Sequence, residues 1–221
     1  MKKTEWFRRT TWTPTDQKEF RDRLSRCRGK YGKPQYVRIQ ASYLAGAGHT
    51  QASLELLDEF LRDYPDSSEL ASARLQRADC FLRMRDVEAA LSEFRAALQA
   101  ERQWPNYQTT CWLDFPWHIV CHRMTTLYDE ASAVLDEFLP IRKLLFPVEE
   151  YKYSAIRAIL NYRGGNVRSA RQFASTAMKS AEATHSGFRY HPNIGLVNKS
   201  DREIRSDLVK ILQSKEPSDL V

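Results

Sequence analysis

The stretch Arg85–Leu98, RDVEAALSEFRAAL, decides the fold class. Placed on a helix, its apolar residues form one stripe: Val87, Ala90, Leu91, Phe94, Ala97 and Leu98. Alanine on a buried stripe lets a second helix approach closely, because the distance between packed helices follows the size of the side chains between them. The stretch therefore predicts a helix that is paired with another helix.

Three further stretches repeat this pattern: QASLELLDEFL (51–61), YDEASAVLDEFL (128–139) and GNVRSARQFASTAM (165–178). The leading alanines of the four helices, separated by 38, 41 and 39 residues, are Ala52, Ala90, Ala131 and Ala170. Similar helices at a nearly constant spacing indicate an internal repeat.

Another amphipathic stretch precedes each of these helices, over residues 35–45, 68–83, 116–127 and 149–163. Short breaks separate the members of each pair: GAGHT, MRD, TLYDE and RGGN. The predicted unit is a helix–turn–helix of about 40 residues.

One unit resembles a known family. The segment ADCFLRMRDVEAALSEFRAAL (78–98) is similar to a tetratricopeptide repeat. The residues that match the small and aromatic positions of that family are Ala78, Phe81, Ala90, Phe94 and Ala97. There are two departures, because Arg77 replaces a large apolar residue and the period exceeds the usual 34 residues. The resemblance covers residues 34–181 and implies a superhelix whose concave groove binds peptides.

The expected fold is therefore all-α: a right-handed α-α superhelix, or solenoid, of about four helix-turn-helix repeats. Residues 1–33 are expected to form a basic aromatic arm and an N-terminal helix over Thr15–Arg28. Residues 182–221 are expected to hold an irregular connection, a C-terminal capping helix and a loose tail. Ser200 and Glu203 have the spacing of a capping box at the start of that last helix.

The charge and the cysteines indicate the cellular environment in which the protein is expected. The net charge is +6, but residues 1–38 carry twelve Lys/Arg and four Asp/Glu, so the remainder is slightly acidic. The four cysteines are scattered without a C-x-x-C pair, and no apolar run suits a signal peptide or a bilayer span. We expect a cytoplasmic chain with reduced thiols that does not enter a membrane.

An arginine series is the sharpest candidate site. Arg83, Arg123 and Arg163 are 40 residues apart and are expected to end the first helices of repeats two to four. In the tetratricopeptide family such a row lies near the peptide groove, and arginine binds carboxylate or phosphate through two hydrogen bonds. The alternative is that cations simply favour the last turn of a helix. Three further residues are expected beside the groove: Asp79, Lys152 and Tyr162.

The basic arm offers a second candidate. In KKTEWFRRTTW (2–12), aromatic and cationic residues alternate, which suits the stacking of bases and contact with phosphates. The residues of this alternative, nucleic-acid-binding site are Trp6, Arg8, Arg9 and Trp12. The competing interpretation is an arm whose aromatic side chains pack on the first helices while its cations face solvent.

A metal site is not expected. In CWLDFPWHIVCH (111–122), Asp114, His118 and His122 follow a spacing of four residues, with Cys111 and Cys121 nearby. Pro116 is expected to begin the helix, which would leave Asp114 outside it. The bulky Trp112, Phe115 and Trp117 are expected to fill the connection between repeats two and three.

No catalytic motif of the G-x-S-x-G, Walker or H-E-x-x-H type occurs, so we expect neither an enzyme nor a cofactor. The expected function is a non-catalytic protein–protein interaction module that binds or sequesters one protein or peptide partner. Short chains of this kind in bacteria resemble adaptor, chaperone and toxin-neutralising proteins. The most specific expectation is an immunity protein that neutralises a cognate toxin.

Overall fold

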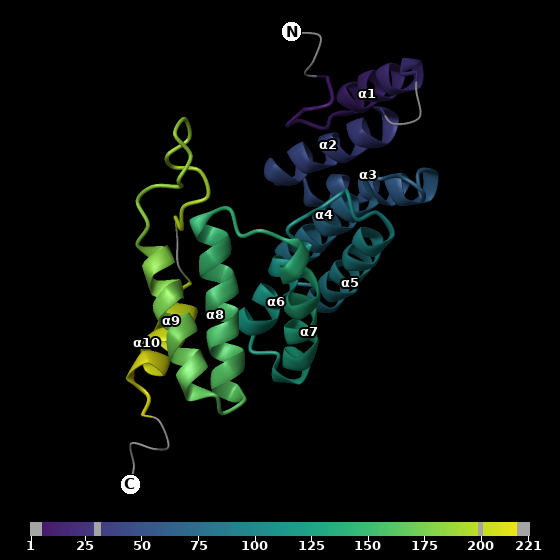
Figure 1. Cartoon of the computed structure of the whole chain (residues 1–221). Coiled ribbons are helices and arrows are strands. Elements are labelled where there is room, and N and C mark those ends of the chain that lie inside the picture. The colour runs from purple at the N-terminus through teal and green to yellow at the C-terminus, as the bar shows by residue number, and fades with distance from the viewer. Residues whose placement is uncertain (1–5, 29–31, 199–200, 216–221) are drawn as a thin grey trace. The chain divides into compact units, whose positions relative to one another are not determined.

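The computed structural model describes residues 6–28, 32–198 and 201–215, which form ten α-helices and two short 3₁₀ helices (Figure 1). Within these residues there is no β-strand, so the all-α prediction is confirmed. The α-helices are α1 (Pro14–Arg26), α2 (Gly32–Gly46), α3 (Thr50–Asp63), α4 (Leu70–Arg83), α5 (Val87–Gln103), α6 (Cys111–Cys121), α7 (Tyr128–Phe138), α8 (Pro147–Arg163), α9 (Val167–Ala181) and α10 (Arg202–Gln213). The 3₁₀ helices are η1 (Thr125–Leu127) and η2 (Leu139–Ile141).

The chain forms two compact units, Met1–Cys111 and Trp112–Val221. In the first unit α2 packs on α3, α3 on α4, and α4 on α5. In the second unit α8 packs on α9, and α10 lies against both of them (Figure 1). α10 therefore covers the last helix pair, as a capping helix would.

Alanine explains which consecutive helices pack closely. Completely buried alanines lie on helices of the pairs α2/α3, α4/α5 and α8/α9, among them Ala41, Ala73, Ala78, Ala90, Ala97, Ala155, Ala158, Ala170 and Ala174. The third expected pair, α6 and α7, approaches less closely than these three. α6 contains no alanine, and its buried side chains, such as Trp112 and Phe115, are large. Large side chains keep helix axes apart.

Ala90→Leu tests the role of the small residue. Ala90 is completely buried on α5, and α5 packs closely against α4. The three added carbon atoms have no space, so we expect the free energy of unfolding to fall by about 1–3 kcal/mol. Urea denaturation of the variant and the wild type measures this loss. An unchanged midpoint would mean that Ala90 does not lie at a helix contact.

The expected helix over 116–127 and its TLYDE break are wrong. α6 begins at Cys111 and ends at Cys121, with Pro116 inside it, and α7 already begins at Tyr128. At the sixth position Pro116 removes one hydrogen bond of the helix and crowds the carbonyl of Trp112, an unfavourable effect confined to the start of α6. Trp112, Phe115 and Trp117 consequently lie on the helix and not in a connection. The first two are buried and Trp117 is half-buried.

Two helix starts differ slightly from expectation. α1 begins at Pro14 with Thr13 as its N-cap, because the Thr13 hydroxyl accepts the N–H of Asp16. α10 has Asp201 as its N-cap, whose carboxylate accepts the N–H groups of Glu203 and Ile204. The predicted cap Ser200 lies outside the described residues, as do residues 216–221 of the expected loose tail.

None of the helices described for this chain combines the length and the apolar character of a membrane span.

Candidate functional site

A cavity of about 280 Å³ in the second unit gathers three of the residues that the sequence singled out. It is lined by Val120, Arg123, Tyr128, Ile159, Tyr162, Arg163, Asp207, Lys210 and Ile211, and we call it the arginine pocket. These residues come from α6 and the turn after it, from α7 and α8, and from α10. The expected neighbours Arg123, Tyr162 and Arg163 thus lie around one cavity.

Local helix ends place the two arginines. Arg163 is the last residue of α8, as expected. Arg123 does not end a helix as predicted, because α6 stops at Cys121 and Arg123 has a left-handed φ of 55°. The Met124 N–H donates to the Ile119 carbonyl at 3.0 Å across this turn. This is the usual way to close a helix, with a non-glycine residue in the position that favours glycine.

The charges of the arginine pocket are unbalanced. Arg123 pairs with Asp207 at 3.2 Å and with Glu203 at 3.4 Å, and Lys210 lies 3.6 Å from Asp207. The Arg163 side chain makes no hydrogen bond or ion pair with any described residue. Among the lining residues, three cations therefore surround one carboxylate.

The remaining lining is apolar and phenolic. Val120, Ile159 and Ile211 form the apolar part of the wall. Burial raises the pKa of Tyr128, although Arg163 and Arg123 act in the opposite direction. Tyr128 therefore stays a neutral hydroxyl at physiological pH, able to donate a hydrogen bond to an anion beside Arg163.

Arg163 also belongs to a second, more polar cavity of about 620 Å³. Its lining consists of Thr125, Tyr128, Asp129, Ser132, Arg157, Leu160, Asn161, Arg163, Gly164 and Asn166. Arg157 is held there by Asp136 and by the Ser132 hydroxyl at 3.1 Å. Tyr128 and Arg163 are common to both cavities, so a ligand that reaches them can contact either one.

The other residues of the predicted groove lie elsewhere. Arg83 ends α4 in the first unit, where its guanidinium donates to the Ala45 carbonyl at 3.1 Å. Asp79 is an exposed residue of the same helix. Lys152 belongs to the second unit but bonds to Asp114 at 2.6 Å and does not line the arginine pocket. The structure thus brings Arg123 and Arg163 together and gives Lys152 a contact within the unit.

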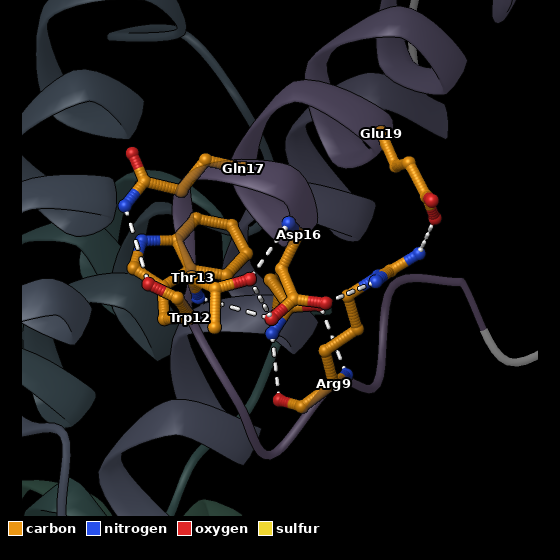
Figure 2. Close-up of polar contacts among 7 residues, drawn as sticks. Arg9, Trp12, Thr13, Asp16, Gln17 and Glu19 are labelled. Carbon is orange, nitrogen blue, oxygen red and sulfur yellow. Dashed lines mark hydrogen bonds and ion pairs between the residues drawn. The ribbon is translucent and has the colours of Figure 1, made fainter.

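The basic arm packs against the first helices. Trp6 is only 8% exposed, with its ring centroid 5.4 Å from that of Phe20 and 5.1 Å from that of Tyr36. The Arg9 guanidinium contacts Asp16 and Glu19 (Figure 2). Its backbone N–H donates to the Gln40 side chain at 3.0 Å. Trp6 and Arg9 therefore hold the arm in place and are not presented to a nucleic acid.

Asp16 is the centre of this arrangement. Its carboxylate accepts the backbone N–H of Thr13 at 3.0 Å and the Thr13 hydroxyl at 2.8 Å (Figure 2). These bonds lower the pKa of Asp16 to about 2. Of the other two predicted residues, Trp12 is half-buried and packs edge-on against Phe20, while Arg8 is exposed above the ring of Phe7.

The histidines of α6 and the turn after it do not form a site with Asp114. The rings of His118 and His122 stack with centroids 6.1 Å apart, and burial lowers the pKa of His118 to about 4. Asp114 is paired with Lys152. In the part of the chain that the structure describes, no three His, Cys, Asp or Glu side chains gather in a way that could hold a metal ion.

Sequence reasoning missed the residues that α10 contributes to the arginine pocket. Asp207 and Lys210 were not singled out in the sequence, and they enter the site through the packing of α10 on α8 and α9. Their spacing of three residues is a local signal of an ion pair but not of its place in the fold.

In comparisons with known proteins, no family model, curated protein or solved structure matches this chain.

Proposed function

We propose that this chain is a non-catalytic protein-interaction module that binds or sequesters one partner protein. In this proposal the arginine pocket receives a carboxylate from the partner. The observation that carries it is Arg163, a cation without an ion-pair partner among the described residues, at the edge of a cavity with an apolar wall.

The chemistry of the pocket favours an acidic group attached to an apolar segment. A carboxylate can take two parallel hydrogen bonds from one guanidinium and a third from the Tyr128 hydroxyl. The apolar wall reduces the screening of such a pair by water, which makes it stronger than the same pair on an open surface. Tyr162 is 41% exposed beside it and offers further contact area.

We further propose that the chain is a cytoplasmic, tetratricopeptide-like right-handed superhelix and that its partner is a toxin that it neutralises. The repeat spacing supports the superhelix part of this proposal. Close pairing in α2/α3, α4/α5 and α8/α9 fits such repeats. A helical-repeat protein presents extended surface to a partner, which suits sequestration better than chemistry.

The strongly shifted titratable groups of the second unit lie outside both cavities. Burial raises the pKa of Cys121 and of Tyr151 to about 12 each, and it lowers the pKa of His118 to about 4. None of these three side chains lines either cavity described above. Their shifts follow from packing and do not require a reaction site.

The test uses three proteins: the wild type, Arg163→Glu, and the control Arg168→Glu on the exposed side of α9. Each is cross-linked in a lysate of the native host, with and without nuclease, and the captured partner is then purified and titrated by calorimetry. We expect one protein partner that survives nuclease, with binding weakened about 10-fold or more by Arg163→Glu and hardly changed by Arg168→Glu.

Two results would contradict the proposal. Equal affinity for all three proteins would remove the arginine pocket from the interface. Recovery of nucleic acid alone, lost after nuclease, would instead support the nucleic-acid alternative, with exposed Arg8 as its first contact to test.

A further inference from the structure

An aromatic–proline motif occurs twice in the first unit, 40 residues apart. Tyr64-Pro65-Asp66 follows α3, and Trp104-Pro105-Asn106 follows α5. This separation is close to the 38 residues between Ala52 and Ala90, and α3 and α5 are both second members of a helix pair. The two motifs therefore follow corresponding helices of consecutive helix pairs.

The backbone fixes both motifs as tight turns. The Ser67 N–H donates to the Tyr64 carbonyl at 3.1 Å, and the Tyr107 N–H donates to the Trp104 carbonyl at 2.9 Å. Proline occupies the second position of each turn, where its fixed φ is favourable. The second turn sets the Trp104 and Tyr107 rings edge to face, with centroids 6.4 Å apart.

A cavity of about 510 Å³ is bordered by both turns. We call it the aromatic cavity, and it is lined by Cys27, Lys33, Pro34, Asp63, Tyr64, Pro65, Asp66, Ser67, Ser68, Trp104 and Tyr107. Trp104 is 41% exposed and Tyr107 is 47% exposed. Large aromatic side chains left open to solvent beside a cavity commonly mark an interaction site.

The charge of the aromatic cavity is acidic. Its lining holds two carboxylates, Asp63 and Asp66, and one ammonium group, that of Lys33. Asp66 has no ion pair with any described residue. Asp63 is bound by Arg62 at 2.8 Å, but Arg62 does not line the cavity and both side chains are exposed, so the pair is weak enough for a ligand to compete for the carboxylate.

The electrostatics at Tyr64 agree with this acidic character. The pKa of Tyr64 is raised mainly by burial and further by the carboxylates of Asp63 and Glu59, against a smaller opposing effect of Arg21. Negative charge therefore dominates at the ring that lies between the two aspartates in the sequence.

We propose that the aromatic cavity binds the guanidinium group of an arginine side chain presented by a partner polypeptide. Arginine stacks on aromatic faces, its planar fork fits carboxylates, and its weak hydration favours a partly closed site. A phosphate or carboxylate ligand would meet an excess of negative charge here. This site lies in a different unit from the arginine pocket and does not depend on the function proposed above.

The test follows the indole N–H of Trp104 by NMR in the ¹⁵N-labelled full chain, with that signal assigned through Trp104→Phe. The probe is the blocked tripeptide acetyl-Gly-Arg-Gly-amide, titrated at constant ionic strength. Two analogues, with citrulline and with glutamate in place of arginine, separate charge from shape. We expect a saturable shift with a millimolar dissociation constant for the arginine peptide, and binding at least about 10-fold weaker for both analogues.

Variants in the same unit locate the effect. Asp66→Asn keeps a turn-compatible side chain and is expected to weaken binding of the arginine peptide about 3- to 10-fold. The control Asp22→Asn removes an exposed carboxylate of α1 outside the cavity and is expected to leave binding unchanged. Absence of saturation, equal binding of the citrulline peptide, or equal losses in both variants would each overturn the proposal, whatever the outcome at Arg163.

Discussion

Gly195→Ala is expected to destabilise the second unit by about 2–5 kcal/mol, the combined effect of backbone strain and overpacking. Gly195 has a left-handed φ of 66°, which costs an L-residue about 1–2 kcal/mol. A Cβ atom at this position would lie 2.5 Å from three atoms of Phe146. Because the obstacle includes the Cβ and the ring of Phe146, the collision cannot be relieved by moving a flexible chain end.

The loss would spread through the contacts that Gly195 and Phe146 hold together. The Gly195 carbonyl accepts the N–H of Val148 in the first turn of α8 at 2.8 Å. The Phe146 ring stacks on Phe188 with centroids 5.2 Å apart. Gly195 thus connects the irregular segment between α9 and α10 to the start of α8, through its hydrogen bond with Val148 and its contact with Phe146.

Urea denaturation of Gly195→Ala and of the control Gly187→Ala measures this effect. Gly187 has a left-handed φ of 86° in the same connection, but a Cβ there would meet nothing within 4 Å. The control should lose only the strain, about 1–2 kcal/mol. Equal losses in the two variants would show that Phe146 does not pack against Gly195.

Features that depend on neighbours in the sequence were predictable. The alanine stripe of Arg85–Leu98 correctly identified α5 and its close partner, and the breaks MRD and RGGN fall between α4 and α5 and between α8 and α9. Helical periodicity and turn residues act over a few positions, so the sequence displays them directly. The start of α6 was predicted wrongly at Pro116, because burial of Trp112 and Phe115 extends this helix past a residue that is unfavourable for a helix.

Features that depend on tertiary contacts were only partly predictable. The 40-residue spacing predicted a row of Arg83, Arg123 and Arg163, and of these Arg123 and Arg163 line one cavity. The contributions of Asp207 and Lys210 to that cavity come from the packing of a distant helix. Alternation of aromatic and basic residues in the arm does not distinguish an exposed Trp6 from a buried one. Burial is a property of the assembled unit, and composition alone does not encode it.

Arg77 illustrates the same limit and leads to the second large effect. It replaces an apolar residue of the tetratricopeptide pattern, yet its side chain is only 13% exposed. Its guanidinium contacts Glu93 on α5 and Asp58 on α3, and lies 5.5 Å from the Phe81 ring centroid. The departure from the pattern is thus compensated by an ion-pair network that links three consecutive helices.

Glu93→Ala is expected to lower the free energy of unfolding of the first unit by about 3–5 kcal/mol. The Glu93 side chain is 10% exposed and accepts bonds from Arg77 at 3.0 Å and from Arg74 at 3.0 and 3.2 Å. Removing it leaves the largely buried Arg77 guanidinium with only the exposed Asp58 as its acidic partner. The control Glu88→Ala, in the exposed first turn of the same helix, should cost less than about 1 kcal/mol.

The stability loss in Glu93→Ala can come from the missing ion pair or from the buried Arg77 cation that has lost its main partner. The double variant Arg77→Leu/Glu93→Leu distinguishes these two causes. Replacing both partners by apolar groups removes the buried cation together with its counter-ion, so most of the stability lost in Glu93→Ala should return. Arg74, with 30% of its side chain exposed, can turn to solvent. A double variant as unstable as Glu93→Ala would mean that the ion pair itself holds α4 and α5 together. Recovery would show instead that an apolar residue at position 77, as in the family pattern, suits this fold once Glu93 is also replaced.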